Sequence, residues 1–118
     1  MERRYRLTKS TDFKRVWRQG HSYAHPLIVL IALTNNGSQT RFGITAGRVL
    51  GGAAKRNRVK RQLRAALHPL LPHIPPGWDI ILLARRPITQ SSFKEIQAAV
   101  VSLLRRANLL NADDEINH

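Results

Sequence analysis

The chain contains no cysteine and few acidic residues. Without cysteine, a disulfide-stabilised fold, a cysteine-based metal site and a thiol nucleophile are excluded, and we expect a cytoplasmic protein. Only seven Asp and Glu oppose 20 Lys and Arg among 118 residues, which gives a net charge of +13. A surplus of this size attracts polyanions over long distances and makes their binding salt-dependent.

Long apolar runs are also missing. The longest, residues 27–33, is far shorter than the roughly 20 residues of a membrane-spanning helix, and the charged N-terminus does not resemble a secretory signal. Before residue 108 the chain carries all 20 Lys and Arg but only four acids, whereas Asp113, Asp114 and Glu115 lie close together near the end. We therefore expect one basic domain over residues 1–107 and a disordered polar tail over residues 108–118.

Hydrophobic periodicity and turn residues predict elements in the order α-β-β-β-α-β-α. A strong turn sequence at residues 35–38 predicts that the strands on either side of it form an antiparallel hairpin. Ser92 and Glu95 have the spacing of a capping box at the start of the last helix. The fold class is α+β, with a small mixed sheet packed against helices. Helices are expected at residues 11–19, 53–68 and from 93 onwards, and strands at residues 21–25, 27–33, 41–46 and 78–84.

The helix over residues 53–68 carries the most informative pattern in the chain. Six of the ten residues from 55 to 64 are cationic. At helical period, Arg56, Lys60 and Arg64 follow one face, with Asn57 and Arg61 beside it. Like charges at this spacing repel each other by a few tenths of a kcal/mol per pair, so such a helix indicates a polyanionic partner. A separate apolar stripe provides the buried face: Val59, Leu63, Ala66 and Leu70.

Residues for catalysis or metal binding are scarce. Residues 47–52 have the glycine spacing of a phosphate-binding loop, but two alanines follow where the loop needs Lys and Ser or Thr. The five histidines have no carboxylate or cysteine at a useful spacing, so no metal site is assigned. Asp12 and Glu95 fit helix starts, and Asp79 stands alone at a predicted strand edge. We therefore assign no catalytic residue to the protein.

Phe13 and Trp17 lie four residues apart on the first helix, among several cations. Aromatic residues at this spacing usually pack into a core. They also provide stacking surfaces for single-stranded nucleic acid. The pattern alone leaves both roles open.

Three segments, in order, resemble the bacterial ribonuclease P protein component. Residues 56–64 resemble its Arg-Asn-Arg signature, and residues 6–20 are similar to its opening, with Asp12-Phe13 and an aromatic at Trp17. Residues 84–87, Ala-Arg-Arg-Pro after an apolar strand, are similar to a later segment. The resemblance implies an α/β sandwich with a left-handed β-α-β crossover, although right-handed crossovers are the general rule.

The resemblance also implies a function. The protein would be an RNA-binding subunit of an endoribonuclease that removes the 5′ leader of precursor tRNA, with the chemistry performed by a catalytic RNA and its Mg²⁺. The implied partners are that RNA and precursor tRNA, with no cofactor on the protein, no membrane and no obligate protein partner. Residues implied to contact the catalytic RNA are Arg56, Asn57, Arg58, Lys60, Arg61 and Arg64. Residues implied to line the leader cleft are Lys9, Phe13, Trp17 and Ile31.

Three other functions remain open from the residues alone. A ribosomal or other structured-RNA-binding protein would have the same composition. An autonomous nuclease is disfavoured by the shortage of carboxylates. Binding to an anionic membrane surface is disfavoured because the apolar helix faces are needed for the core.

Overall fold

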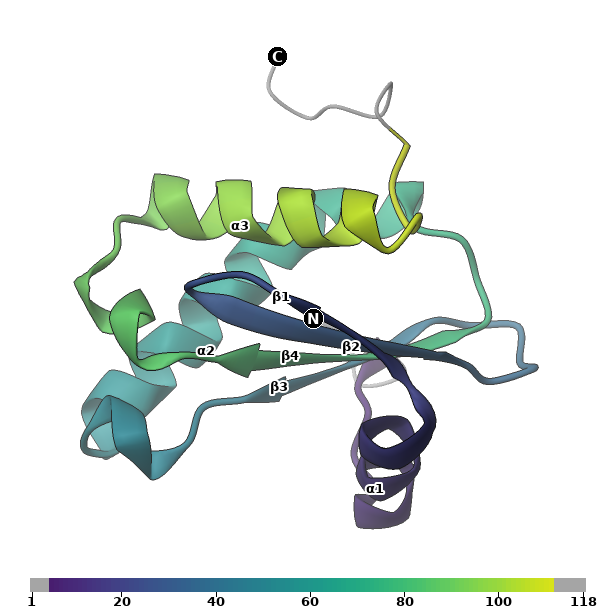
Figure 1. Ribbon diagram of the computed structural model, residues 1–118, viewed down its shortest axis with the longest axis horizontal. Coiled ribbons are helices and arrows are strands. Elements are labelled where there is room, and N and C mark those ends of the chain that lie inside the picture. The colour runs from purple at the N-terminus through teal and green to yellow at the C-terminus, as the bar shows by residue number, and fades with distance from the viewer. Residues whose placement is uncertain (1–4, 112–118) are drawn as a thin grey trace.

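The computed structural model describes residues 5–111, and residues 1–4 and 112–118 lie outside the description. A sheet forms the middle layer, with α2 and α3 on one face and α1 on the other (Figure 1). This arrangement confirms the predicted α+β sandwich and its order of elements. No helix in residues 5–111 is long and apolar enough to cross a membrane. The helices are α1 (Ser10–Gln19), α2 (Ala53–Leu67) and α3 (Phe93–Arg106), and the strands are β1 (His21–Ala24), β2 (Ile28–Thr34), β3 (Arg41–Thr45) and β4 (Trp78–Ala84).

The order of strands across the sheet is β1-β2-β4-β3. β4 pairs antiparallel with β2 and parallel with β3, which places its apolar run at the centre of the sheet. The predicted hairpin of β2 and β3 is therefore wrong. The turn itself is present, with Asn36 at a φ of 58°. However, β4 is apolar on both faces and lies between the two strands, while the more polar β3 takes the edge.

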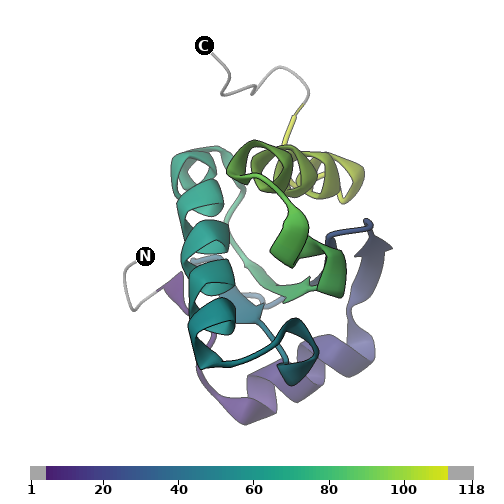
Figure 2. The ribbon, with the colours of Figure 1, turned by 90° about the vertical axis from the view of Figure 1, so that its left-hand side faces the viewer.

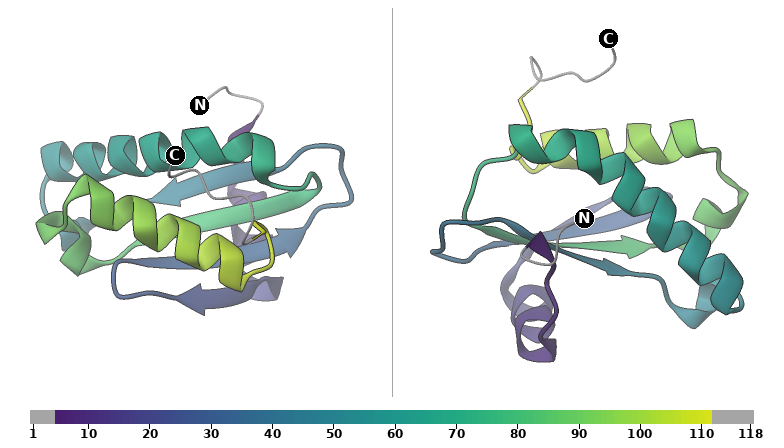
Figure 3. Two further views of the ribbon diagram at one scale, coloured as in Figure 1. Left: turned by 90° about the horizontal axis from the view of Figure 1, so that it is seen from above. Right: turned by 180° about the vertical axis from the view of Figure 1, so that it is seen from behind.

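The connection β3-α2-β4 is a crossover between parallel strands. In the view from above, β3 runs to the left, α2 returns in front of the sheet, and β4 runs to the left below β3 (Figure 3, left). Turned so that both strands point upwards, β4 lies to the left of β3 with the helix in front, which makes the crossover left-handed. About 98% of such connections are right-handed, so periodicity could not have predicted this feature.

Each face of the sheet has its own hydrophobic core because side chains alternate along a strand. The larger core lies between the sheet and α2 and α3, and it includes Leu30 and Leu82. The smaller core lies under α1, where Val16 packs with Ile31 and Ile81. The predicted apolar stripe of α2 is buried in the larger core.

Both ends of α3 are capped. The predicted capping box is confirmed, since Glu95 N donates to Ser92 Oγ at 3.1 Å and Ser92 N donates to Glu95 Oε1 at 2.8 Å. At the other end Leu109 N donates to Leu104 O at 2.8 Å, past Asn108 at a φ of 59°. Leu109 and its neighbour Leu110 are buried in the larger core. The packed chain thus continues to Leu110. Most of the predicted tail lies outside the described residues, and the predicted domain over residues 1–107 stays a prediction.

Asp79 links α1 to the sheet through a buried cluster of charges. Its carboxylate is fully buried and accepts hydrogen bonds from Arg41 Nε at 3.0 Å, Arg41 Nη2 at 2.8 Å, Asn35 Nδ2 at 2.8 Å and Arg15 Nη2. Asp12 lies nearby, with its Oδ1 atom 3.6 Å from Arg15 and its Oδ2 atom 3.4 Å from Arg41. Asp79 is therefore not an isolated acid at a strand edge. It is a central-strand residue that joins α1, β3 and the β2–β3 turn.

Burial by itself would raise the pKa of Asp79. The hydrogen bonds from Arg41, Asn35 and Arg15 outweigh burial and hold the pKa below its usual value. The ionised carboxylate is thus favoured in the folded state. Its contribution to stability is complete above the unfolded pKa of about 3.9 and is lost as the pH falls through the lower folded pKa.

We predict that Asp79→Asn lowers the free energy of unfolding by about 1–3 kcal/mol at neutral pH. The amide cannot accept the same set of hydrogen bonds, although Arg15 and Arg41 are about a third exposed and regain water. The difference between parent and variant should shrink as the pH falls below about 3.9, since protonation removes the same interaction from the parent. Urea unfolding across this pH range measures both effects, and a pH-independent difference would contradict the assignment.

Candidate nucleic-acid interface

The α1 face of the sheet is only partly covered by α1. Strand pairing arranges its side chains in rows across the sheet, and α1 lies over the row that contains Ile31 and Ile81. A neighbouring row, nearer the carboxyl ends of β3 and β4, stays partly exposed and forms a largely apolar floor. In order across the sheet this open row consists of Ala24, Val29, Leu83 and Thr45.

Phe13 and Trp17 lie on the side of α1 that faces this floor. Helical geometry places Asp12 and Arg15 on the opposite flank of α1, toward Asp79. Phe13 is half-buried, and its ring occupies the space over Gly43 where a side chain would otherwise lie. Trp17 is 56% exposed, which is unusual for the largest apolar side chain. The two aromatic side chains therefore differ in environment. The ring of Phe13 packs against the sheet, whereas the ring of Trp17 is exposed and open to a ligand.

At the β3 edge, α1 and α2 approach each other. The segment before α1 lies along β3, with Leu7 N donating to Phe42 O at 2.8 Å. A cavity of about 120 Å³ lies there, and Phe13, Lys60 and Arg64 are among its lining residues. Figure 2 looks along the sheet at this arrangement, with α1 below the sheet and α2 along one side. The cations of α2 are thus continuous with the aromatic side of α1.

The six predicted RNA-contacting residues do not share one face of α2. Arg56, Lys60 and Arg64 are half-buried along the flank that leads to the cavity. Asn57 and Arg61 are exposed on the outer surface of the helix. The remaining residue, Arg58, is exposed and lies about 160° around the helix from Lys60, given 100° per residue. The set therefore wraps around the exposed half of α2.

The four predicted cleft residues separate into three environments. Lys9 is exposed at the start of α1, and Phe13 and Trp17 lie as described above. Ile31 is only 5% exposed because it packs beneath α1 with Val16 and Ile81. Its side chain supports α1 and is not open to a ligand. On the same strand face, one row away, Val29 is only partly buried.

Sequence reasoning missed the open floor and the Asp79 cluster. Val29, Leu83 and Thr45 sit in ordinary strand patterns, and only the strand order brings them into one row. The alternation of faces could have identified Val29 once α1 was placed on Ile31. No local signal marks Asp79, because Arg15 lies 64 residues away from it and Arg41 lies 38 residues away.

The arrangement suits binding of an anionic strand. A partly apolar floor and an exposed indole can contact bases, while flanking cations contact phosphates. Asp12 and Asp79 are engaged with arginines, and Glu95 caps α3 on the other face of the sheet. Within residues 5–111 no three His, Asp, Glu or Cys side chains gather into a possible metal site. The described residues thus offer contacts and charge, but no acid–base pair at the cleft.

Comparison with known proteins shows the family to which the chain belongs. The family model described as Ribonuclease P matches residues 1–108. The ribonuclease P protein component of Roseiflexus sp. (strain RS-1) is 39% identical over 115 residues, covering 97% of this chain and 94% of that protein. The chain belongs to the ribonuclease P protein family. Relatives named in the same way include that of Herpetosiphon aurantiacus, 39% identical over 109 residues, covering 92% of this chain and 89% of that protein.

Solved structures of the ribonuclease P protein have the same fold. The Staphylococcus aureus protein superposes with a TM-score of 0.84 at 33% identity, covering 91% of this chain and 98% of that one. The Thermotoga maritima protein gives a TM-score of 0.78 at 28% identity, covering 86% of this chain and 96% of that one. A ribonuclease P protein component is the protein subunit of an endoribonuclease holoenzyme, and membership therefore implies an RNA partner.

We predict that Gly43→Ala disturbs the cleft through Phe13. A Cβ at residue 43 would lie 2.5 Å from Phe13 Cζ, so the ring must move, and such overpacking costs about 1–3 kcal/mol. In a Phe13→Ala background the same substitution should cost much less, which a double-mutant cycle by urea unfolding measures. Gly47→Ala is the matched control, because no atom lies within 4 Å of its Cβ position. An equal cost of Gly43→Ala in both backgrounds would show that the ring is not the obstacle.

Proposed function

We propose that this protein binds the catalytic RNA of ribonuclease P through α2 and holds the 5′ leader of precursor tRNA in the cleft beside α1. Leader removal then produces the mature 5′ end of the tRNA, with the RNA and its Mg²⁺ performing the chemistry. The observation that carries this proposal is the cavity at the β3 edge, where Lys60 and Arg64 of α2 meet Phe13 of α1. A single anionic strand can therefore run from the cations of α2 to the aromatic side of α1.

The two parts of this surface contribute in different ways. Arginine and lysine on α2 neutralise phosphates and release counterions, which gives affinity without sequence selectivity. The open floor, with Trp17 beside it, is narrow and partly apolar, and it suits an unpaired strand whose bases can turn toward it. A single-stranded leader has such bases along its length, whereas most bases of a folded tRNA are paired or stacked. The cleft therefore favours precursor over mature tRNA.

The α2 assignment is tested in a reconstituted cleavage assay with catalytic RNA and precursor tRNA over a series of Mg²⁺ concentrations. The parent protein should lower the Mg²⁺ requirement, because its cations replace part of the counterion atmosphere between two polyanions. Arg61→Ala should raise the requirement again and weaken binding to the catalytic RNA. It should also flatten the dependence of log K on log salt by about one unit. Folding should be unchanged, since Arg61 is exposed and the apolar stripe stays intact.

Lys94→Ala is the matched control for charge, because Lys94 is an exposed helical cation on α3, away from the cleft. It should leave the Mg²⁺ requirement of the holoenzyme near that of the parent. If parent and Arg61→Ala bind the RNA equally at every salt concentration, α2 is not the RNA-binding surface. Specific 5′ maturation by protein free of RNA would instead indicate an autonomous nuclease.

The leader assignment is tested with Trp17→Ala in the holoenzyme. We expect weaker binding of precursor tRNA, by the roughly 1–3 kcal/mol of one lost base stack, and little change for mature tRNA. Thermal stability should be nearly unchanged because the indole is mostly exposed. Phe13→Ala should differ by also lowering stability, since its ring packs over Gly43. Equal weakening of both tRNAs by Trp17→Ala would contradict a leader-specific cleft.

A further inference from the structure

The two edges of the sheet are covered in different ways. At β3 the segment before α1 continues the sheet, with Leu7 N donating to Phe42 O and a parallel bridge between Arg6 and Phe42. At β1 no segment among residues 5–111 pairs with the outer side of the strand. In the view from above, β1 forms the lower border of the sheet (Figure 3, left). An open strand edge of this kind offers its N–H and C=O groups to another strand.

The turn after β1 determines which backbone groups lie on this free edge. His25 and Ile28 exchange two hydrogen bonds across the turn, at 2.9 and 3.3 Å. Hydrogen-bonded and non-hydrogen-bonded pairs alternate along an antiparallel ladder, so Tyr23 bonds to β2 while the backbone groups of Ser22 and Ala24 point away from the sheet. Both of these residues are exposed. The free edge thus presents their N–H and C=O groups.

This edge is complementary to itself. In an antiparallel pair with a second copy of the chain, Ser22 of each strand would lie opposite Ala24 of the other, as a two-fold axis requires. Each opposed pair would exchange two hydrogen bonds, which satisfies the outward groups of both strands at once. The two sheets would then form one continuous sheet through both copies.

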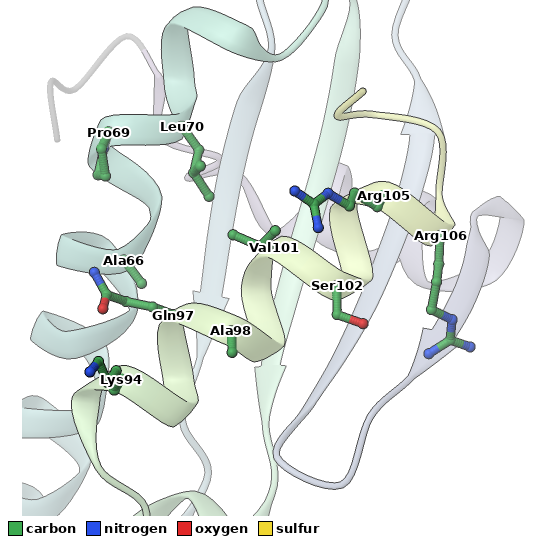
Figure 4. Close-up of a pocket in the computed structure, with 10 residues that line it drawn as sticks. All are labelled: Ala66, Pro69, Leu70, Lys94, Gln97, Ala98, Val101, Ser102, Arg105 and Arg106. Carbon is green, nitrogen blue, oxygen red and sulfur yellow. The ribbon is translucent and has the colours of Figure 1, made fainter. Parts of the chain in front are cut away.

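One of the outward groups already has a partner. Arg106, the last residue of α3, donates a hydrogen bond from Nη1 to Ala24 O at 2.6 Å. The end of α3 is fixed in place because Leu109, just beyond it, is buried in the larger core. Figure 4 shows Arg106 on the outer side of α3, on the opposite side of the helix from Leu70. The guanidinium of Arg106 therefore lies at the free edge of β1.

We propose that Arg106 prevents two copies of the chain from pairing through their β1 edges. Half of the hydrogen bonds in such a dimer would end on Ala24 O, and Arg106 Nη1 occupies the position that the N–H of the second strand needs. A second copy would also bring its own guanidinium to the same edge, where the two charges repel each other. The hydrogen bonds that remain are too few for a strand of only four residues. The inference is independent of the proposed function.

The free edge of β1 adjoins the open floor on the α1 face. Ala24 is the β1 residue of the open row, beside Val29. A second copy paired with β1 would lie directly beside this end of the row. Arg106 therefore acts from the opposite face of the sheet to keep the β1 side of the cleft accessible.

The test measures self-association by sedimentation equilibrium at high salt, which screens the general repulsion between cationic chains. The parent should remain monomeric. Arg106→Ala should dimerise, with a dissociation constant lower than that of the parent by about 5–30-fold, since the hydrogen bonds to Ala24 O become available. The fold should be unchanged because Arg106 is exposed, and thermal unfolding checks this.

Lys94→Ala is the matched control, because it removes an exposed cation from the other end of α3. It should self-associate no more than the parent. If Arg106→Ala associates no more strongly than Lys94→Ala, the proposal is overturned.

A second substitution identifies the surface of the dimer. Ser22→Pro removes an outward N–H and no hydrogen bond to β2, a change that an edge strand tolerates. In the Arg106→Ala background it should restore the monomer. Hydrogen exchange followed by NMR should also show the amides of Ser22 and Ala24 protected in the Arg106→Ala dimer and exchanging rapidly in the parent. A dimer that persists with Ser22→Pro, or that leaves both amides unprotected, would use another surface, and the proposal would be wrong.

Discussion

The cleft depends on the carboxylate of Asp79. This single buried group accepts hydrogen bonds from α1 through Arg15, from β3 through Arg41 and from the β2–β3 turn through Asn35. A buried charge is tolerated only when its partners satisfy it, so the three elements must arrive together with their side chains in place. The small core under α1 adds apolar contact, which has no directional preference. The hydrogen bonds to Asp79 set the direction of α1 across the sheet, and with it the side on which Trp17 faces the open floor.

The two faces of the sheet differ in how completely helices cover them. The α2–α3 face carries most of the apolar burial, and the half-exposed flank of α2 brings its cations to the β3 edge. The α1 face is incompletely covered and keeps a row of strand side chains open. Because the crossover is left-handed, α2 reaches that edge while the chain returns to place β4 in the centre. The cations of α2 and the aromatic side of α1 thus meet at the β3 edge of the sheet, although they belong to different helices.

Local sequence patterns correctly predicted the structural features that depend on residues close together in the chain. The capping box at Ser92 and the buried stripe of α2 each follow from neighbouring residues. The pairing of β3 could not be predicted in this way. A turn sequence indicates that the chain changes direction, but it does not identify the strand with which the next strand pairs. The handedness of the crossover came only from the resemblance to a family. Of the predicted site, the exposure of Trp17 fits a binding surface, whereas the burial of Ile31 depends on where α1 lies and has no local signature.

The central position of β4 also determines when the protein can acquire its shape on the ribosome. β2 and β3 are neighbours in the chain, yet each pairs with a strand that begins only at Trp78. Asp79, on which α1 depends, lies in that same strand. While the first two thirds of the chain emerge, a helix, a two-stranded ribbon and an unpaired third strand have no stable sheet to join. Completion of the fold therefore waits for late residues, and the exposed edges of β2 and β3 are the part of the nascent chain most open to wrong pairing.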